Sequence, residues 1–384
     1  MKICFVTTTS ISIESFILPI IPCLQGVGFE VSVVTGCMPG FKEQCDQSII
    51  IYDYPVGRGF DFLGTFKSVI KFRKLCEKEK YDIVAYATPN GALYGSIGSW
   101  MAKVPNRVLL QWGMRYVGFE GIMRRVILSI EKLDCRLSTT IRNVSEKNRQ
   151  MAINDRMYKP EKCKVLGKGG TIGVDLSQYV IEDIPLRRSS IREKYVIPDD
   201  AIVYGFVGRL CKDKGVKELL MAFDQVSNRG DNTYLLLVGG WDVNSGIENS
   251  IIEQAKRNSR IVFTGQVPNK DVVNYLSTCD VLVHPTYREG FGMVLQEAAA
   301  LGLPTITTNI PGASEAIVDG ETGLLVEKQD VDTLVVAMNK LLDPLLRETL
   351  GKAGRKRIEK DFERNMMIER ICDDYLEICN NTKN

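Results

Sequence analysis

Residues 284–326 decide the fold, and they read HPTYREGFGMVLQEAAALGLPTITTNIPGASEAIVDGETGLLV. The stretch begins at the end of an apolar run, and its first loop carries Gly290 and Gly292. The pattern predicts a helix over 293–300 and a second strand over 304–307. A helix that starts directly after a glycine-rich loop presents backbone N–H groups and the positive end of its dipole. Both favour a bound anion.

Two carboxylates flank this predicted anion site. Glu289 lies in the loop, and Glu297 lies about two helical turns further on. A diphosphate at the helix start would lie between them, so that one carboxylate could hold a sugar hydroxyl and the other a ribose hydroxyl. The alternative is that Glu289 is solvated and Glu297 pairs on a helix face, as most surface glutamates do.

A second loop brings two cations to the end of an earlier predicted strand, 201–207. The loop reads GRLCKDKG over 208–215, with Arg209 and Lys214 five residues apart. Arg offers a forked pair of bonds to phosphate and Lys a point charge, so together they suit a departing nucleoside diphosphate. The alternative is a pair of surface cations neutralised by Asp213 and Glu218.

Length and composition set the class of protein. The chain has 384 residues, 45% hydrophobic and 25% charged, which is typical of two globular domains. Strands that alternate with helices over short connections predict an α/β fold with parallel sheets.

The 11 cysteines form no C-x-x-C pair, which favours reduced thiols. His284 is the only histidine, which excludes a histidine-rich metal site and a Ser-His-Asp triad elsewhere.

Charge is distributed unevenly along the chain. Residues 1–178 contain 24 Lys and Arg against 16 Asp and Glu, whereas residues 179–384 contain 25 against 31. A basic N-terminal half favours an anionic partner or membrane surface, although a chance distribution is the alternative. Residues 123–133 mix bulky apolar residues with Arg124, Arg125 and Lys132, and this segment could lie on a membrane interface. The alternative is a core-facing helix with a polar back.

The 284–326 stretch resembles the signature of family-4 retaining glycosyltransferases, whose E-x7-E motif falls on Glu289 and Glu297. The 208–215 loop is similar to that family's G-R-L-x-x-x-K-G. The resemblance covers nearly the whole chain and implies the GT-B fold, in which two Rossmann-like domains face a central cleft. It implies an acceptor-binding domain over 1–178, a donor-binding domain over 179–363, and a C-terminal helix, about 364–384, that crosses back to the first domain.

The resemblance also implies roles for individual residues. Catalysis falls to Arg209, Lys214 and Glu289, through a front-side route assisted by the leaving group. It implies no cofactor and no metal, because Arg and Lys supply the positive charge. The implied donor-binding residues are Glu297, Gly290, Phe291, Gly292, Met293, Val294, Gly265 and Pro268.

Acceptor-side residues are expected in the first domain. Gln111 stands where relatives usually carry a histidine, so a hydrogen bond to a hydroxyl replaces any His-mediated contact. Lys168, in a glycine-rich bend, is a candidate for an acceptor phosphate, with a solvated linker lysine as the alternative. The full acceptor-side set is Thr9, Ser10, Gln111, Arg115 and Lys168.

Within the family, residues 112–125, 167–175 and 215–219 are similar to bacterial transferases that extend undecaprenyl-diphosphate-linked saccharides for capsule, O-antigen or N-glycan precursors. This implies transfer of a hexose or N-acetylhexosamine from a UDP-sugar to a polyprenyl-diphosphate-linked saccharide. It also implies a cytoplasmic protein held peripherally on the inner membrane, without nucleic acid. A nucleotide-sugar 2-epimerase and a non-catalytic nucleotide-sugar-binding subunit are the alternatives. The single histidine disfavours the first, and the intact motif residues disfavour the second.

Overall fold

The computed structural model describes residues 1–54, 62–228, 230, 232–242 and 245–383. The chain divides into two compact units: unit 1 is Met1–Ile172 with Asn365–Asn384, and unit 2 is Gly173–Arg364. The sequence places the first boundary at 178/179. The earlier boundary has a structural reason, because Val174 pairs with the end of unit 2. Its N–H donates to the Phe362 carbonyl at 2.8 Å, and its carbonyl accepts from the Arg364 N–H at 3.0 Å.

Unit 1 is built on a parallel sheet with the spatial order β3-β2-β1-β4-β5-β6-β7. Its strands are β1 (Lys2–Thr9), β2 (Glu30–Gly36), β3 (Ile50–Asp53), β4 (Ile83–Tyr86), β5 (Asn106–Gln111), β6 (Thr140–Asn143) and β7 (Cys163–Val165). Its helices are α1 (Ser10–Phe16), α2 (Ile21–Gly26), α3 (Phe41–Gln44), α4 (Phe62–Glu79), α5 (Pro89–Met101), α6 (Gly121–Leu137), α7 (Glu146–Asn154) and α16 (Arg364–Lys383).

Unit 2 is built on a second parallel sheet, in the order β10-β9-β8-β11-β12-β13. Its strands are β8 (Ile202–Val207), β9 (Thr233–Val238), β10 (Ile261–Gly265), β11 (Val281–His284), β12 (Thr305–Thr308) and β13 (Gly323–Val326). Its helices are α8 (Ile184–Tyr195), α9 (Val216–Ser227), α10 (Asn249–Arg257), α11 (Val272–Leu276), α12 (Met293–Ala300), α13 (Ala313–Ala316), α14 (Val331–Lys340) and α15 (Pro344–Asp361).

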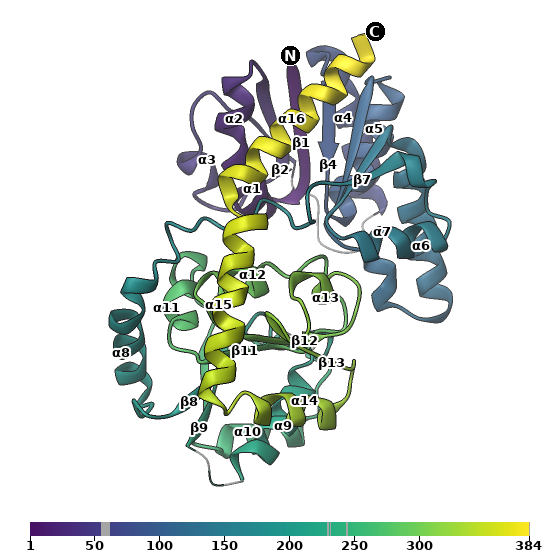
Figure 1. Cartoon of the computed structure of the whole chain (residues 1–384). Coiled ribbons are helices and arrows are strands. Elements are labelled where there is room, and N and C mark those ends of the chain that lie inside the picture. Colours follow the sequence, from purple (N-terminus) through teal and green to yellow (C-terminus); the bar gives the residue numbers. More distant parts are fainter. Residues whose placement is uncertain (55–61, 229, 231, 243–244, 384) are drawn as a thin grey trace. The chain divides into compact units, whose positions relative to one another are not determined.

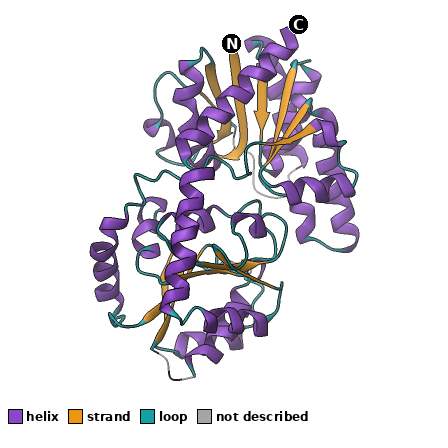
Figure 2. Cartoon of the chain, in the orientation of Figure 1, coloured by secondary structure: helices purple, strands orange, loops and turns teal. Residues whose placement is uncertain are grey.

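Both sheets have the strand order of a doubly wound Rossmann fold. In each unit the order reverses beside the first strand, between β1 and β4 in unit 1 and between β8 and β11 in unit 2. Figure 2 shows the strands of each unit as one twisted sheet flanked by helices. The predicted α/β class with two Rossmann-like domains is confirmed. Ligands of such folds bind at the carboxyl ends of the strands, where the order reverses.

The C-terminal helix α16 belongs to unit 1, as the family resemblance predicts, and Figure 1 shows it in yellow across that unit. Its Tyr375 ring lies edge-on to Phe5 of β1, with 5.8 Å between the ring centroids. Asp374 accepts two bonds from the Arg142 guanidinium at 2.6 and 2.9 Å. The helix is therefore anchored to unit 1 by both core packing and a nearly buried ion pair.

The sequence predicts a turn at 89–91, which is wrong, because these residues form the first turn of α5. Glycines at 91, 95 and 98 lower the helix propensity of this segment. They are needed for close packing. A Cβ at Gly95 would lie 2.9 Å from Tyr86 Cβ, and one at Gly98 would lie 2.9 Å from the Phe72 ring. Tertiary packing therefore overrides the local preference.

Candidate functional site

The site of unit 2 forms where the loops after β8 and β11 meet. The Tyr287 N–H donates to the Asp213 carbonyl at 2.9 Å, and Thr286 Oγ1 donates to the same carbonyl at 3.2 Å. Gly215 has φ +69°, and a Cβ there would lie 1.9 Å from the Pro285 carbonyl oxygen. Only glycine fits this contact. The strand order thus brings together two loops that lie more than seventy residues apart in the sequence.

Lys214 and Glu289 face each other across these loops. Lys214 Nζ lies 2.6 Å from Glu289 Oε2, and His284 Nε2 lies 3.2 Å from the same oxygen. Burial opposes the charge on Glu289, but the Lys214 ammonium and the His284 ring outweigh it and hold the pKa of Glu289 well below its ordinary value. Glu289 is therefore an ionised carboxylate that is already paired with the Lys214 ammonium.

His284 is the site residue that the sequence analysis missed. It is 2% exposed and stacks on Phe206, with 5.8 Å between ring centroids. Burial lowers its pKa despite the neighbouring Glu289, so the ring is neutral at pH 7. A signal was present in the sequence, since the only histidine ends a buried strand five residues before Glu289.

Arg209 takes a different partner from Lys214. Its guanidinium is exposed and forms an ion pair with Asp242, which follows β9. The suggested pairing of the two cations with Asp213 and Glu218 is wrong, because those carboxylates are used elsewhere. Asp213 accepts from Arg288 at 2.7 and 3.0 Å. Glu218 accepts from the hydroxyl of Tyr287, 2.6 Å away.

Helix α12 begins at Met293, directly after Gly292 with φ +89°. Its predicted bounds match the structure, and Met293 and Val294 in its first turn are half-buried. The Phe291 side chain packs on Phe362 in the core, with 5.5 Å between ring centroids. Any contact of Phe291 with a ligand would therefore use its backbone. Gly290 is buried in the loop before it.

Glu297 lies on α12, and its environment differs from that of Glu289 in the preceding loop. Burial raises its pKa, while Arg364 and a hydrogen bond with Tyr179 act in the opposite direction. Neither partner was anticipated from the sequence, because both lie more than sixty residues away. The preceding residue, Gln296, is fully buried, and its amide has no hydrogen-bond partner among the described residues.

The loops after β9 and β10 continue the same edge of the sheet. A Cβ at Gly239 would lie 1.9 Å from the Gly208 carbonyl oxygen, and the Gly239 N–H donates to the Gly265 carbonyl at 3.0 Å. Gly265, with φ +71°, and Pro268 are exposed. Gly265 and Pro268, which the resemblance implies as donor-binding residues, thus lie at the same carboxyl ends of the strands as Lys214 and Glu289. Their roles stay predictions.

The acceptor-side residues of unit 1 differ in accessibility. Lys168 is exposed, and Thr9 and Arg115 are half-buried. Ser10 is fully buried and accepts from the Met38 N–H at 3.2 Å. Ser10 is therefore not the accessible donor that the sequence suggests.

Gln111 is also buried. Its Oε1 accepts from Asn143 Nδ2 at 2.7 Å and from the Tyr158 hydroxyl at 2.9 Å. These bonds give Gln111 a role in joining β5 to β6 and to Tyr158, and its contact with an acceptor stays a prediction.

Thr88 marks the point in unit 1 where the strand order reverses. It is a β-branched residue at φ +63°, an uncommon backbone conformation for this residue type. Its hydroxyl accepts from the Thr8 N–H at 2.8 Å and bonds the Thr8 hydroxyl at 2.8 Å. These bonds tie β1 to the start of α5. No local pattern in the sequence points to Thr88, since strain of this kind depends on contacts distant in sequence.

Comparison with known proteins identifies the family. Glycosyl transferase 4-like matches residues 2–145, and Glycosyl transferases group 1 matches residues 187–357. The capsular polysaccharide biosynthesis glycosyltransferase CapM of Staphylococcus aureus is 34% identical over 324 residues, which are 84% of this chain and 83% of CapM. The UDP-Gal:alpha-D-GlcNAc-diphosphoundecaprenol alpha-1,3-galactosyltransferase of Escherichia coli is 23% identical over 91% of this chain and 89% of its own.

A solved structure shows the same fold. HepE of Anabaena, in complex with UDP and glucose, matches 98% of this chain and 100% of its own with a TM-score of 0.80 at 20% identity. With its two Rossmann-like units and its match to CapM, the chain belongs to the group 1 glycosyl transferases and is a glycosyltransferase of the GT-B fold.

Proposed function

We propose that this glycosyltransferase moves a hexose or N-acetylhexosamine from a UDP-sugar to a polyprenyl-diphosphate-linked saccharide. We further propose that the anomeric configuration is retained and that the pathway builds a bacterial surface polysaccharide or glycan. The relatives support this, since CapM is named for capsule biosynthesis and the Escherichia coli enzyme for a UDP-galactose donor and a diphosphoundecaprenol acceptor. The observation that supports the proposal most directly is the Lys214–Glu289 pair at the carboxyl ends of β8 and β11.

The donor would bind with its diphosphate at the start of α12. Lys214 and Arg209 supply positive charge, and their attraction grows as charge develops on the leaving diphosphate, which lowers the barrier. Glu289 stays ionised and can accept from hydroxyls of the transferred sugar, and Glu297 from those of the ribose. In this scheme the two cations do the work that a metal ion does in other transferases.

The reaction would follow a front-side route in which the departing diphosphate takes the proton of the attacking hydroxyl. Glu289 is the motif carboxylate that contacts Lys214. Its Oε2 is occupied by Lys214 and His284, which suits a group that binds hydroxyls better than one that attacks carbon. Retention is therefore proposed without a covalent intermediate.

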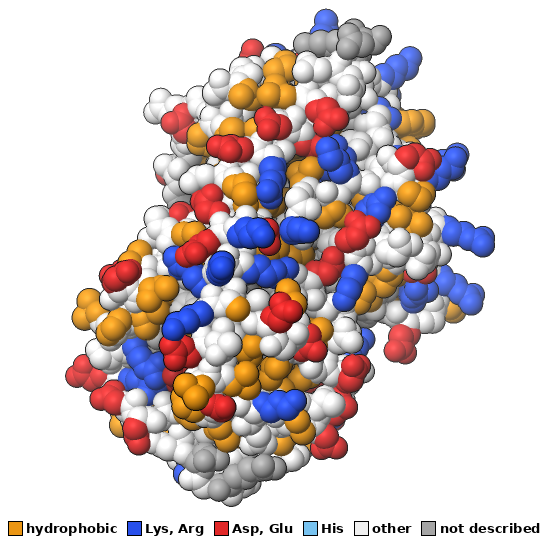
Figure 3. Space-filling model, viewed as in Figure 1, with side chains coloured by type: hydrophobic (Ala, Val, Ile, Leu, Met, Phe, Trp, Pro, Cys, Tyr) orange, Lys and Arg blue, Asp and Glu red, His pale blue; other side chains and the backbone are white. Residues whose placement is uncertain are grey.

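Helix α6 of unit 1 is the proposed contact with the membrane surface. Its exposed apolar side chains are Ile122, Met123, Val126 and Leu133, with Ile122 80% exposed. Basic side chains lie beside apolar ones on the part of unit 1 that includes α6, at the right of Figure 3. Among the described residues, no helix has the length and apolar character that a bilayer span requires. We propose a cytoplasmic protein held peripherally on the inner membrane, because an apolar stripe flanked by Lys and Arg suits anionic lipid.

A donor and acceptor panel tests the proposal. The purified chain is mixed with UDP-, GDP- and dTDP-sugars, with and without a short polyprenyl-diphosphate-linked sugar, and nucleoside diphosphate release and product mass are measured. We expect release with one UDP-sugar, strongly enhanced by the lipid-linked acceptor. Release from a GDP- or dTDP-sugar alone would overturn the donor assignment. Transfer only to soluble sugars would overturn the acceptor assignment.

A further inference from the structure

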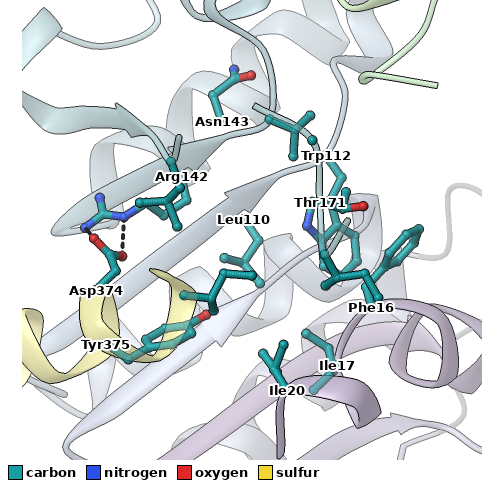
Figure 4. Close-up of a pocket in the computed structure, with 15 residues that line it drawn as sticks. Phe16, Ile17, Ile20, Leu110, Trp112, Arg142, Asn143, Thr171, Asp374 and Tyr375 are labelled. Carbon is teal, nitrogen blue, oxygen red and sulfur yellow. Dashed lines mark hydrogen bonds and ion pairs between the residues drawn. The ribbon is translucent and has the colours of Figure 1, made fainter. Parts of the chain in front are cut away.

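Unit 1 contains an apolar cavity of about 60 Å³ between its sheet and α16. This is several times the roughly 10–15 Å³ that one water molecule needs. Figure 4 shows Phe16, Ile17 and Ile20 on one side and Tyr375 of α16 on the other. The lining residues are Phe16, Ile17, Ile20, Leu110, Trp112 and Tyr375, with others from β6, the loop after β7 and α16.

The polar side chains of the lining are largely occupied within the protein. Arg142 binds Asp374 through Nε and Nη2, and its Nη1 donates to Thr140 Oγ1 at 2.6 Å. Asn143 donates to Gln111, and its Oδ1 accepts from the Ser145 N–H at 2.9 Å. The cavity therefore offers apolar surface, so neither an anion nor a sugar is favoured inside it.

Two cations lie at the edge of this cavity. Leu166 and Gly170 line it, and the turn between them carries the exposed Lys168. The Arg370 guanidinium lies over the same turn, since a Cβ at Gly167 would be 2.5 Å from Arg370 Nη1. The ion pairs of the described residues include neither Lys168 nor Arg370. An apolar cavity with unneutralised positive charge at its edge matches an anionic lipid.

We propose that this cavity binds the first part of the isoprenoid chain of a polyprenyl diphosphate, with Lys168 and Arg370 supplying positive charge for the diphosphate. The inference rests on the proposed function, which gives the enzyme a polyprenyl-linked acceptor, and it adds the subsite for the lipid. When the branched hydrocarbon enters the cavity, its apolar surface and that of the cavity lining are removed from water. The diphosphate stays at the edge of the cavity, beside Lys168 and Arg370. Neither half alone would bind as well as both together.

Calorimetric titration of the full-length protein tests the subsite. Farnesyl diphosphate provides both halves of the ligand, inorganic pyrophosphate only the anion, and farnesol only the chain. We expect farnesyl diphosphate to bind at least about tenfold more tightly than either fragment. Equal affinities for farnesyl diphosphate and pyrophosphate would overturn the apolar subsite.

Substitutions in and beside the cavity test where farnesyl diphosphate binds. Val144 lines the cavity, and Val144→Phe should fill it and weaken farnesyl diphosphate binding by about tenfold or more. Lys168→Ala and Arg370→Ala should each weaken it by about fivefold to tenfold. Lys159→Ala, an exposed lysine of unit 1 outside the lining, is the matched control and should bind as the wild type does. The Lys168 variant lies on an exposed turn, so it tests the inference even if Val144→Phe fails to fold.

The outcomes separate this inference from the proposed function. Unchanged farnesyl diphosphate affinity in Lys168→Ala, Arg370→Ala and a folded Val144→Phe would overturn the subsite, even if transfer to a lipid-linked sugar is observed. Conversely, loss of affinity in these variants supports the subsite, even if the donor and acceptor panel shows transfer to soluble sugars alone.

Discussion

Lys214 Nζ lies 2.6 Å from Glu289 Oε2, although the two residues are 75 positions apart in the sequence. The pair forms because β8 and β11 are neighbours in the sheet, so the loops that follow them meet at one edge. Both side chains are largely buried, with 23% and 19% exposed. The pair therefore holds the positive charge of Lys214 against the loop that precedes α12.

Glu289→Gln should abolish most of the activity and lower stability. The variant leaves the Lys214 ammonium without its carboxylate in a partly buried site, at a cost of about 1–3 kcal/mol in unfolding free energy. We expect kcat to fall by at least about 100-fold. Glu248→Gln, which removes the partner of the nearby Lys217, is the matched control and should leave kcat unchanged. Wild-type kcat in Glu289→Gln would remove this carboxylate from the mechanism.

The pH dependence of this stability difference follows from the low pKa of Glu289. A carboxyl whose pKa is lower in the folded state contributes fully above its unfolded pKa, about 4.3, and loses that contribution as the pH falls toward the folded pKa. The difference in unfolding free energy between wild type and Glu289→Gln should be constant from pH 8 to pH 5 and shrink below about pH 4. Denaturant titrations across this range measure it. A decrease between pH 8 and pH 6 would contradict the assigned ionisation.

Asp134 should make unit 1 less stable as the pH rises. Burial raises its pKa to about 7, against the Ser96 hydroxyl that donates to it at 2.7 Å. Because the folded state holds this proton more tightly than the unfolded state, stability is lost between about pH 4 and pH 7. Asp134→Asn should therefore be more stable than wild type at pH 8, by about 1–3 kcal/mol, and similar at pH 4. Thermal unfolding at both pH values tests this, with the exposed Glu77→Gln as the control.

Gly215→Ala tests the contact between the two site loops. Gly320 is the matched control, because its φ of +73° resembles the +69° of Gly215 but a Cβ there meets nothing within 4 Å. Gly320→Ala should cost only the backbone strain, about 1 kcal/mol. Gly215→Ala should cost about 3 kcal/mol or more, because its Cβ would overlap the Pro285 carbonyl, and activity should fall with it. Equal losses of unfolding free energy in Gly215→Ala and Gly320→Ala would show that the contact between the two site loops does not contribute to stability.

Local sequence signals predicted helix α12 and the two parallel sheets well. The glycine before Met293, the apolar residues that follow and Gly302 fixed the bounds of α12, because glycine-rich ends and helical periodicity act over a few residues. The two parallel sheets followed from the alternation of strands and helices. These features depend on neighbours in the sequence, so they can be predicted without a structure.

Contacts between distant segments could not be predicted in this way. Helix α5 was missed because its glycines pack against Tyr86 and Phe72, which no local preference reveals. The burial of Gln111 depends on Asn143 and Tyr158. The partners of Glu297, Tyr179 and Arg364, come from opposite ends of unit 2. In each case a tertiary contact decides the role of the residue.

We propose that Lys214 stabilises the charge on the departing nucleoside diphosphate. The most direct measurement compares kcat/KM of Lys214→Ala and wild type, using the donor and acceptor that the wild type accepts. Lys217→Ala, three residues away and paired with Glu248, is the control. We predict a loss of at least about 100-fold for Lys214→Ala, with Lys217→Ala unchanged. A folded Lys214→Ala protein with near-wild-type kcat/KM would contradict this role of Lys214.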